Sequence, residues 1–118
     1  MREQTLRRTS EFKRVFAEGR KVVAPELIIH CARNFEGAGR LGIVVSRRNG
    51  NAVQRNRIRR RLKEAVRILG GVTPGFDVVV VARPAAKEAR FDRLREQLWK
   101  ILANPGSERT GMETSSGA

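Results

Sequence analysis

The chain has 118 residues, with 25 Lys and Arg against 12 Asp and Glu, which gives a formal net charge of +13. This length suits a single domain, and the lack of a run of about 18 apolar residues argues against a membrane-spanning helix. The single cysteine (Cys31) and single histidine (His30) exclude an intramolecular disulfide and a cysteine-based zinc site, and they weaken any histidine-based catalytic site. Because no hydrophobic secretion signal opens the sequence, we expect a cytoplasmic protein.

The first third of the chain predicts a basic arm, a short helix and strands. Residues 1–8 are polar and basic, and we expect a loosely ordered N-terminal arm there. Ser10 can cap a helix that ends near Gly19, where a glycine can adopt the left-handed conformation that follows many helices. The extended segment Val22–Arg33 is expected to form two strands separated at Pro25.

The middle of the chain predicts another strand and a long helix. A turn over residues 34–39 leads to a strand at Leu41–Ser46. Asn51 then begins a helix through an Asn-x-x-Gln pattern that is typical of a capping box. Apolar residues recur at helical spacing as far as about Leu69, so we expect the helix to end there.

The last part predicts a buried strand, a helix and a tail. A run of valines favours a strand at 76–82, and a helix is expected at about 86–102. The tail, residues 104–118, is rich in Gly, Ser and Thr, and we expect disorder. The order αβββαβα indicates a single α+β domain, residues 9–103, in which helices cover one sheet.

The positive charge is concentrated between Arg47 and Arg67. This segment of 21 residues holds nine basic residues and one acid, Glu64, a net charge of +8. One carboxylate cannot balance nine cations, and like charges four residues apart on a helix repel each other. Most of these cations are arginines, whose planar guanidinium groups match phosphate oxygens. The segment therefore predicts a polyanionic partner, and nucleic acid more readily than a membrane surface.

The segment Ser46–Glu64 (SRRNGNAVQRNRIRRRLKE) resembles the signature of bacterial ribonuclease P protein components, with an Arg-Asn-Arg motif after a Gly-x-Ala-Val helix start. Three further blocks match in order: EFKRVF at 11–16, LGIVVS at 41–46 and DVVVVARP at 77–84. The resemblance covers roughly residues 5–102. It implies an α-β sandwich similar to the second domain of ribosomal protein S5, with the basic helix in a left-handed β-α-β crossover. General topology rules alone would favour the right-handed form.

The resemblance also implies a function. The family supplies the protein subunit of a ribonucleoprotein endonuclease, ribonuclease P, which removes the 5′ leader from precursor tRNA. In this family a large RNA with bound Mg²⁺ performs the hydrolysis, so we expect no catalytic residue and no tightly bound metal in the protein. The implied partners are the catalytic RNA and precursor tRNA, with neither a membrane nor an obligate protein partner.

Two binding surfaces follow from the resemblance. The residues expected to contact the catalytic RNA are Arg47, Arg48, Arg55, Asn56, Arg57, Arg59, Arg60 and Arg61. The single-stranded leader is expected in a cleft between the first helix and the sheet, against Phe12, Phe16 and His30. From the residues alone, Phe12 and Phe16 are more simply core residues, and His30 is equally well a polar residue at the sheet surface.

Two alternatives stay open at this point. A general RNA-binding or ribosome-associated protein would bind mature and precursor tRNA with similar affinity. An autonomous nuclease would need a cluster of His, Asp and Glu residues, which the sequence does not offer. Outside the two surfaces, Cys31 is expected to pack in the core, and Trp99 is expected to pack beside the apolar stripe of the last helix.

Overall fold

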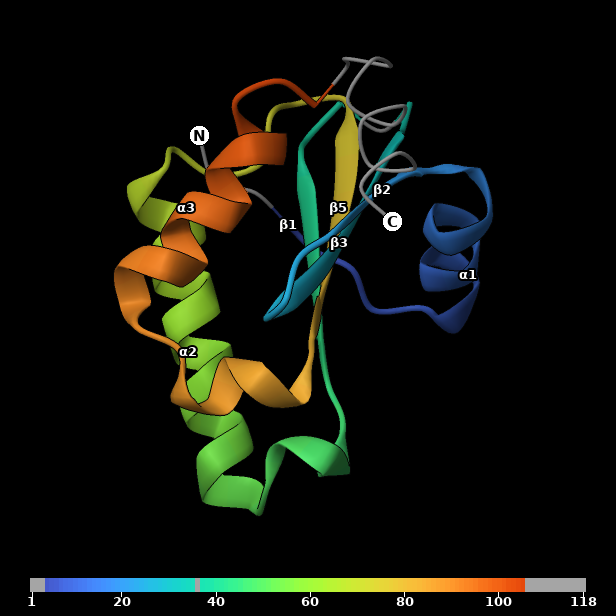
Figure 1. The fold of residues 1–118 in the computed structure, drawn as a ribbon. Helices are drawn as coiled ribbons and strands as arrows, with labels where there is room; N and C mark the ends of the chain where they lie inside the picture. The colour runs from blue at the N-terminus through green and yellow to red at the C-terminus, as the bar shows by residue number, and fades with distance from the viewer. Residues whose placement is uncertain (1–3, 36, 106–118) are drawn as a thin grey trace.

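The computed structural model describes residues 4–35 and 37–105, which form one mixed sheet with helices on both of its faces (Figure 1). The elements in chain order are β1 (Gln4–Thr5), α1 (Thr9–Glu18), β2 (Arg20–Val23), β3 (Leu27–Arg33), β4 (Arg40–Val45), the 3₁₀ helix η1 (Arg47–Asn49), α2 (Ala52–Ile68), β5 (Phe76–Ala82), the 3₁₀ helix η2 (Pro84–Glu88) and α3 (Phe91–Leu102). The strands lie side by side in the order β1-β4-β5-β3-β2. The predicted α+β class is confirmed, and the order αβββαβα is preceded by one short strand.

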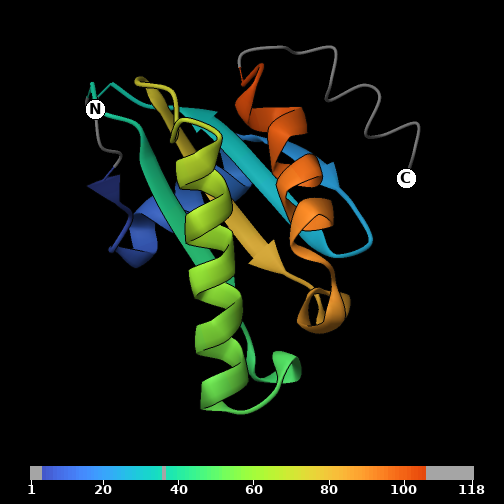
Figure 2. The same ribbon diagram turned by 90° about the vertical axis from the view of Figure 1, so that its left-hand side faces the viewer.

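The helix α2 connects two parallel neighbouring strands, β4 and β5. In Figure 2, α2 lies in front of the sheet, both strands run downwards, and β5 lies to the right of β4. A path that descends along β4, rises through α2 and descends again on the right is left-handed. The less common hand, expected from the family, is therefore confirmed.

The larger core lies between the sheet and the pair α2 and α3. Alternate residues of the central strands point into it, because successive side chains of a strand face opposite sides. These residues include Leu27, Ile29, Cys31, Val78 and Val80. Cys31 is buried as predicted, and burial raises the pKa of its thiol to about 11, so it stays protonated at neutral pH. Trp99, expected to pack beside the apolar stripe of the last helix, is 53% exposed on α3, so the stripe covers it only in part.

The smaller core holds α1 against the other face of the sheet. It contains Leu6, Val15, Ala32 and Val79, and Phe12 packs against it. Val15 is the one residue of α1 that is fully buried. Apolar burial therefore attaches α1 to the sheet through a small area.

The N-terminal segment is more ordered than its composition predicts. Gln4–Thr5 pairs in parallel with β4, the Leu6 N–H donates to the Leu41 carbonyl at 2.9 Å, and the Leu6 side chain is buried. The expectation of a loose arm is therefore wrong for residues 4–8, because Leu6 supplies apolar surface to the smaller core. Residues 1–3 and 106–118, which include nearly all of the predicted disordered tail, lie outside the described residues.

The first helix ends at Gly19 as predicted, but the conformation of this glycine, the N-cap of α1 (Arg8 in place of Ser10) and the start of the last helix differ from the prediction. Gly19 ends α1 in an extended conformation (φ −84°, ψ 166°), and a Cβ there would lie 2.6 Å from the carbonyl oxygens of both Cys31 and Val15. Close backbone approach, and not a left-handed conformation, requires this glycine. The last helix begins at Phe91, because Ala89 and Arg90 are extended after the 3₁₀ turn that Pro84 opens.

Candidate nucleic-acid interface

The start of α2 is fixed by a reciprocal cap. Asn51 Oδ1 accepts a hydrogen bond from the Gln54 N–H, and Gln54 Oε1 accepts one from the Asn51 N–H, both at 2.9 Å. The buried side of the helix carries Ile58, Leu62, Ala65 and Val66. The predicted cap and apolar stripe are confirmed, and together they turn the opposite side of α2 towards solvent.

The solvent side of α2 and the adjoining η1 carry unbalanced positive charge. The exposed members of the predicted motif are Arg47, Arg48, Asn56, Arg57 and Arg60. Within the part of the chain that the structure describes, Arg67 is the one cation of α2 in an ion pair, and its partner is Glu64. We call the five exposed residues, together with Arg55 and Arg59 beside them, the basic surface.

Arg55 and Arg59 differ from the other members because they are half-buried. The Nε atom of each is buried, and it donates to no acceptor among residues 4–35 and 37–105. A buried donor without an acceptor costs free energy. An acceptor supplied by a bound partner, such as a phosphate oxygen, would offset that cost.

Arg61 has an internal partner, unlike its neighbours. Its Nη2 donates to the Ala89 carbonyl oxygen at 2.6 Å, which links α2 to the segment between η2 and α3. Burial, with a further contribution from the nearby Arg57, holds the pKa of Arg61 below its usual range. Arg61 therefore fixes the extended break before α3, and its predicted contact with RNA stays a prediction.

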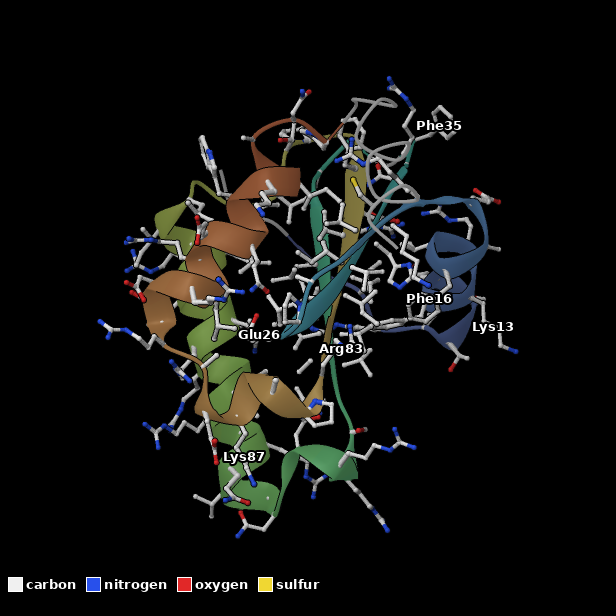
Figure 3. The ribbon with its side chains drawn as sticks, viewed as in Figure 1. Lys13, Phe16, Glu26, Phe35, Arg83 and Lys87 are labelled. Atoms are coloured by element: carbon white, nitrogen blue, oxygen red, sulfur yellow. The ribbon has the colours of Figure 1, made fainter. Side chains whose placement is uncertain are left out.

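Two cations that sequence reasoning missed lie at the same end of the sheet as η1. Because β4 and β5 are parallel, the residues that follow them meet at one edge, and the buried Asn49 donates from Nδ2 to the Arg83 carbonyl at 2.8 Å. Arg83 and Lys87 lie at this end (Figure 3). Their position shortly after the strand predicted at 76–82 is the signal that could have identified them.

The other candidate surface lies beside α1, where the helix leaves part of the sheet uncovered. Phe16 is 42% exposed, and its ring meets the His30 ring edge to face, with ring centroids 4.6 Å apart. Ile28 and Val81 are paired across β3 and β5 on the same side of the sheet, and both are partly exposed. We call these four residues the aromatic face.

Phe12 and Phe16 have different environments, although both were predicted to line one cleft. Phe12 is half-buried, and its ring lies so close to Gly42 that a Cβ there would be 2.6 Å from Phe12 Cε1. Phe12 therefore packs α1 onto the sheet. Phe16 offers the exposed aromatic ring.

His30 is a neutral side chain in this environment. Burial, with a smaller contribution from the positive charge of Lys21 on the neighbouring strand, lowers the pKa of His30 below its usual value. The Nδ1 atom is buried and has no hydrogen-bond partner within the described residues. At neutral pH the imidazole therefore serves as an uncharged ring beneath Phe16.

A family model described as Ribonuclease P matches residues 1–106. The chain belongs to this family. It is 45% identical over 103 residues to the ribonuclease P protein component of Chloroflexus aurantiacus. The aligned residues make up 86% of this chain and 76% of that protein. The fold is similar to the RNase P protein of Staphylococcus aureus (TM-score 0.76, 27% identity, 89% and 97% coverage) and to that of Thermotoga maritima (TM-score 0.73, 33% identity, 86% and 96% coverage).

Membership of this family shows to which ribonucleoprotein the chain belongs. It is a protein subunit of ribonuclease P, which acts in the processing of tRNA 5′ ends, and its partner is an RNA component. The alternative of a general RNA-binding or ribosome-associated protein has no support from these relatives. No helix in the described part of the chain is long and apolar enough to cross a membrane.

Proposed function

We propose that this ribonuclease P protein holds two RNA segments at once, the catalytic RNA on the basic surface and the 5′ leader of precursor tRNA on the aromatic face. The observation that carries the proposal is the unbalanced charge of the basic surface: among the described residues, only Arg67 of the α2 cations has a carboxylate partner. Phosphates of a folded RNA would supply the missing negative charge.

Guanidinium groups suit such a partner. An arginine can donate two parallel hydrogen bonds to one phosphate, which fixes both distance and direction. Arg57 and Arg60 project from the exposed side of α2, while Arg47 and Arg48 extend the same surface along η1. The catalytic RNA would therefore contact a continuous surface made by a helix and the strand end that precedes it.

The leader would bind differently, because single-stranded bases can stack on aromatic rings. Phe16 supplies an exposed ring held at a fixed angle by His30, and the aliphatic side chains of Ile28 and Val81 extend the surface. Stacking tolerates any base, so this surface suits leaders of varied sequence. Arg83 follows Val81 by two residues, and its carbonyl accepts a hydrogen bond from Asn49 of η1. Its Nη1 donates to the Ala24 carbonyl at 3.0 Å, and its other nitrogens would contact the leader backbone as the leader passes towards the catalytic RNA.

The chemistry belongs to the RNA in this proposal. Among the described residues, no three His, Cys, Asp or Glu side chains gather in a group that could hold a metal ion. Mg²⁺ held by the RNA subunit and the substrate would activate the attacking water. The protein would raise the affinity for the precursor and act in the cytoplasm.

Reconstitution tests this function. A bacterial ribonuclease P RNA is mixed with precursor tRNA at a Mg²⁺ concentration too low for the RNA alone, and the full chain is then added. We expect cleavage at the 5′ end of the mature tRNA, and tighter binding of precursor than of mature tRNA by the complex. Failure with several such RNAs would contradict the proposal.

The protein without RNA is the necessary control. Cleavage of the precursor by the protein alone would assign the chemistry to the protein and overturn the division of labour proposed above. Equal affinity of the complex for precursor and mature tRNA would show that the protein does not bind the leader. The proposed binding of the catalytic RNA would be unaffected by that result.

A further inference from the structure

A fully buried carboxylate joins α1 to the sheet. Asp77, on β5, has a side chain with 0% exposure. Arg40 donates to it from Nε and Nη2, each at 2.8 Å, and Asn34 donates from Nδ2 at 2.7 Å. The remaining donor is Arg14, which reaches Asp77 from α1. Asp77 thus accepts hydrogen bonds from three side chains, two of which are guanidinium groups.

A second set of contacts runs between the same helix and the sheet. Arg40 also donates from Nη1 to Glu11 Oε2 at 3.0 Å, and Arg14 donates from Nη1 to the Arg33 carbonyl at 2.9 Å. Glu11 accepts the backbone N–H of Arg8 at 3.2 Å, so it also fixes the start of α1. Two side chains one turn apart on α1 are thus held by the sheet. Together with the packing of Val15 and Phe12, these polar contacts hold α1 in its orientation on the sheet.

Helix geometry couples the position of Phe16 to the contact between Arg14 and Asp77. At 100° per residue, Arg14 and Phe16 point about 200° apart, on opposite sides of α1. Val15, between them in sequence, faces the sheet, so a rotation of α1 about its axis that lifts Arg14 from Asp77 turns the Phe16 ring towards the sheet and changes its position against His30. In Figure 3, Phe16 lies between α1 and the sheet, whereas Lys13 points away from the sheet.

We propose that the Arg14–Asp77 pair is a positioning pair for leader recognition, which sets the rotation of α1 so that Phe16 presents its ring beside His30. The inference rests on the proposed function of the aromatic face. Arg14 acts through Phe16 and does not contact the leader. Its removal therefore alters the discrimination between precursor and mature tRNA without weakening the binding of the catalytic RNA, which lies on the opposite face of the sheet.

The test is a double-mutant cycle between Arg14→Met and Phe16→Ala in the reconstituted complex. Arg14→Met leaves Asp77 hydrogen-bonded to Arg40 and Asn34, so the buried carboxyl group keeps partners in the variant. Lys13→Met is the matched control, because it removes one positive charge from the next, exposed residue of the same helix. The measured quantities are the affinities of the complex for precursor and mature tRNA, the affinity of protein for catalytic RNA, and the slope of log affinity against log salt concentration.

We expect Arg14→Met to lower the precursor-to-mature affinity ratio by about tenfold, and Lys13→Met by less than about twofold. In the double variant, Arg14→Met should not lower the affinity ratio below that of Phe16→Ala alone, because both changes remove the same ring from its position. Arg14→Lys should recover part of the ratio by keeping one donor on Asp77. Additive effects of Arg14→Met and Phe16→Ala, or a salt slope reduced by Arg14→Met, would overturn the proposal, since either result means that Arg14 binds RNA independently.

Two further outcomes have defined meanings. If Arg14→Met does not fold, Glu11→Gln takes its place in the cycle, because it weakens the second link between α1 and Arg40 while keeping a hydrogen-bond acceptor; additivity with Phe16→Ala then overturns the proposal in the same way. If Phe16→Ala alone leaves the affinity ratio unchanged, the aromatic face does not bind the leader, and the proposed function fails together with this inference.

Discussion

Phe16 and His30 meet edge to face, with ring centroids 4.6 Å apart and an interplanar angle of 76°. This arrangement is a favoured geometry for paired rings, because the electron-poor edge of one ring approaches the electron-rich face of the other. It joins a residue of α1 to a residue of β3, and it leaves Phe16 42% exposed. The ring is thus fixed in orientation and still accessible to a ligand.

Phe16→Ala is expected to reduce leader recognition with little effect on stability. Base stacking on an aromatic side chain contributes about 1–3 kcal/mol, so the preference of the complex for precursor over mature tRNA should fall roughly 5- to 150-fold. Equilibrium binding of both tRNAs to the reconstituted complex measures the ratio, and urea unfolding of the free protein measures stability.

Phe35→Ala is the matched control for that variant. Phe35 is 97% exposed, in the turn after β3, and it lies outside the aromatic face. Its removal should leave the preference unchanged. An equal loss of preference in both variants would mean that general surface hydrophobicity, and not the position of Phe16, governs binding.

Arg57→Ala combined with Arg60→Ala is expected to weaken assembly with the catalytic RNA. For every RNA phosphate that the protein no longer neutralises, the slope of log affinity against log salt concentration should fall by about 0.7–0.9. Titration of labelled catalytic RNA at several salt concentrations measures both affinity and slope. Lys100→Ala removes an exposed cation on α3, away from the basic surface, and serves as the control. A steep slope retained in the double variant would place the RNA elsewhere.

Lower pH is expected to destabilise the folded protein through His30. Its pKa is lowered in the folded state by burial and by Lys21, so as pH falls through about 6.5 the unfolded chain takes up a proton before the folded protein does. Stability from this residue is therefore complete above that pH and declines below it. Urea unfolding at about pH 7.5 and about pH 5.5 should show a larger loss for the natural protein than for His30→Gln. Equal losses in the two proteins would show that His30 titrates normally.

Much of the fold could be predicted because its signals are local. The cap at Asn51, the apolar stripe of α2 and the valine run of β5 each depend on residues near one another in sequence, and the structure has all three in place. The concentration of charge on α2 could be predicted for the same reason. Its residues share one helix, so spacing alone determines which of them face solvent.

The parts that could not be predicted depend on contacts between distant residues. Asp77 appears in the sequence as one acid before a run of valines, and only the fold brings Arg14, 63 positions away, onto it. Arg61 belongs to the basic motif by sequence, yet its donor meets the Ala89 carbonyl, which no periodicity reveals. The hand of the β4-α2-β5 crossover came from the family resemblance, since topology rules favour the opposite hand.

Gly42→Ala is expected to disturb α1 through Phe12. A Cβ at position 42 would lie 2.6 Å from Phe12 Cε1 and 3.3 Å from Leu6 Cδ1, so the Phe12 ring must move. Overpacking of this kind costs about 1–3 kcal/mol, and the displaced ring would lift α1 from the sheet. Urea unfolding should show the loss of stability, and the precursor-to-mature affinity ratio should fall as Phe16 leaves His30. Phe12→Leu in the same background shortens the side chain and should restore both quantities in part. A stable Gly42→Ala variant with an unchanged ratio would mean that α1 can shift on the sheet without consequence for the leader.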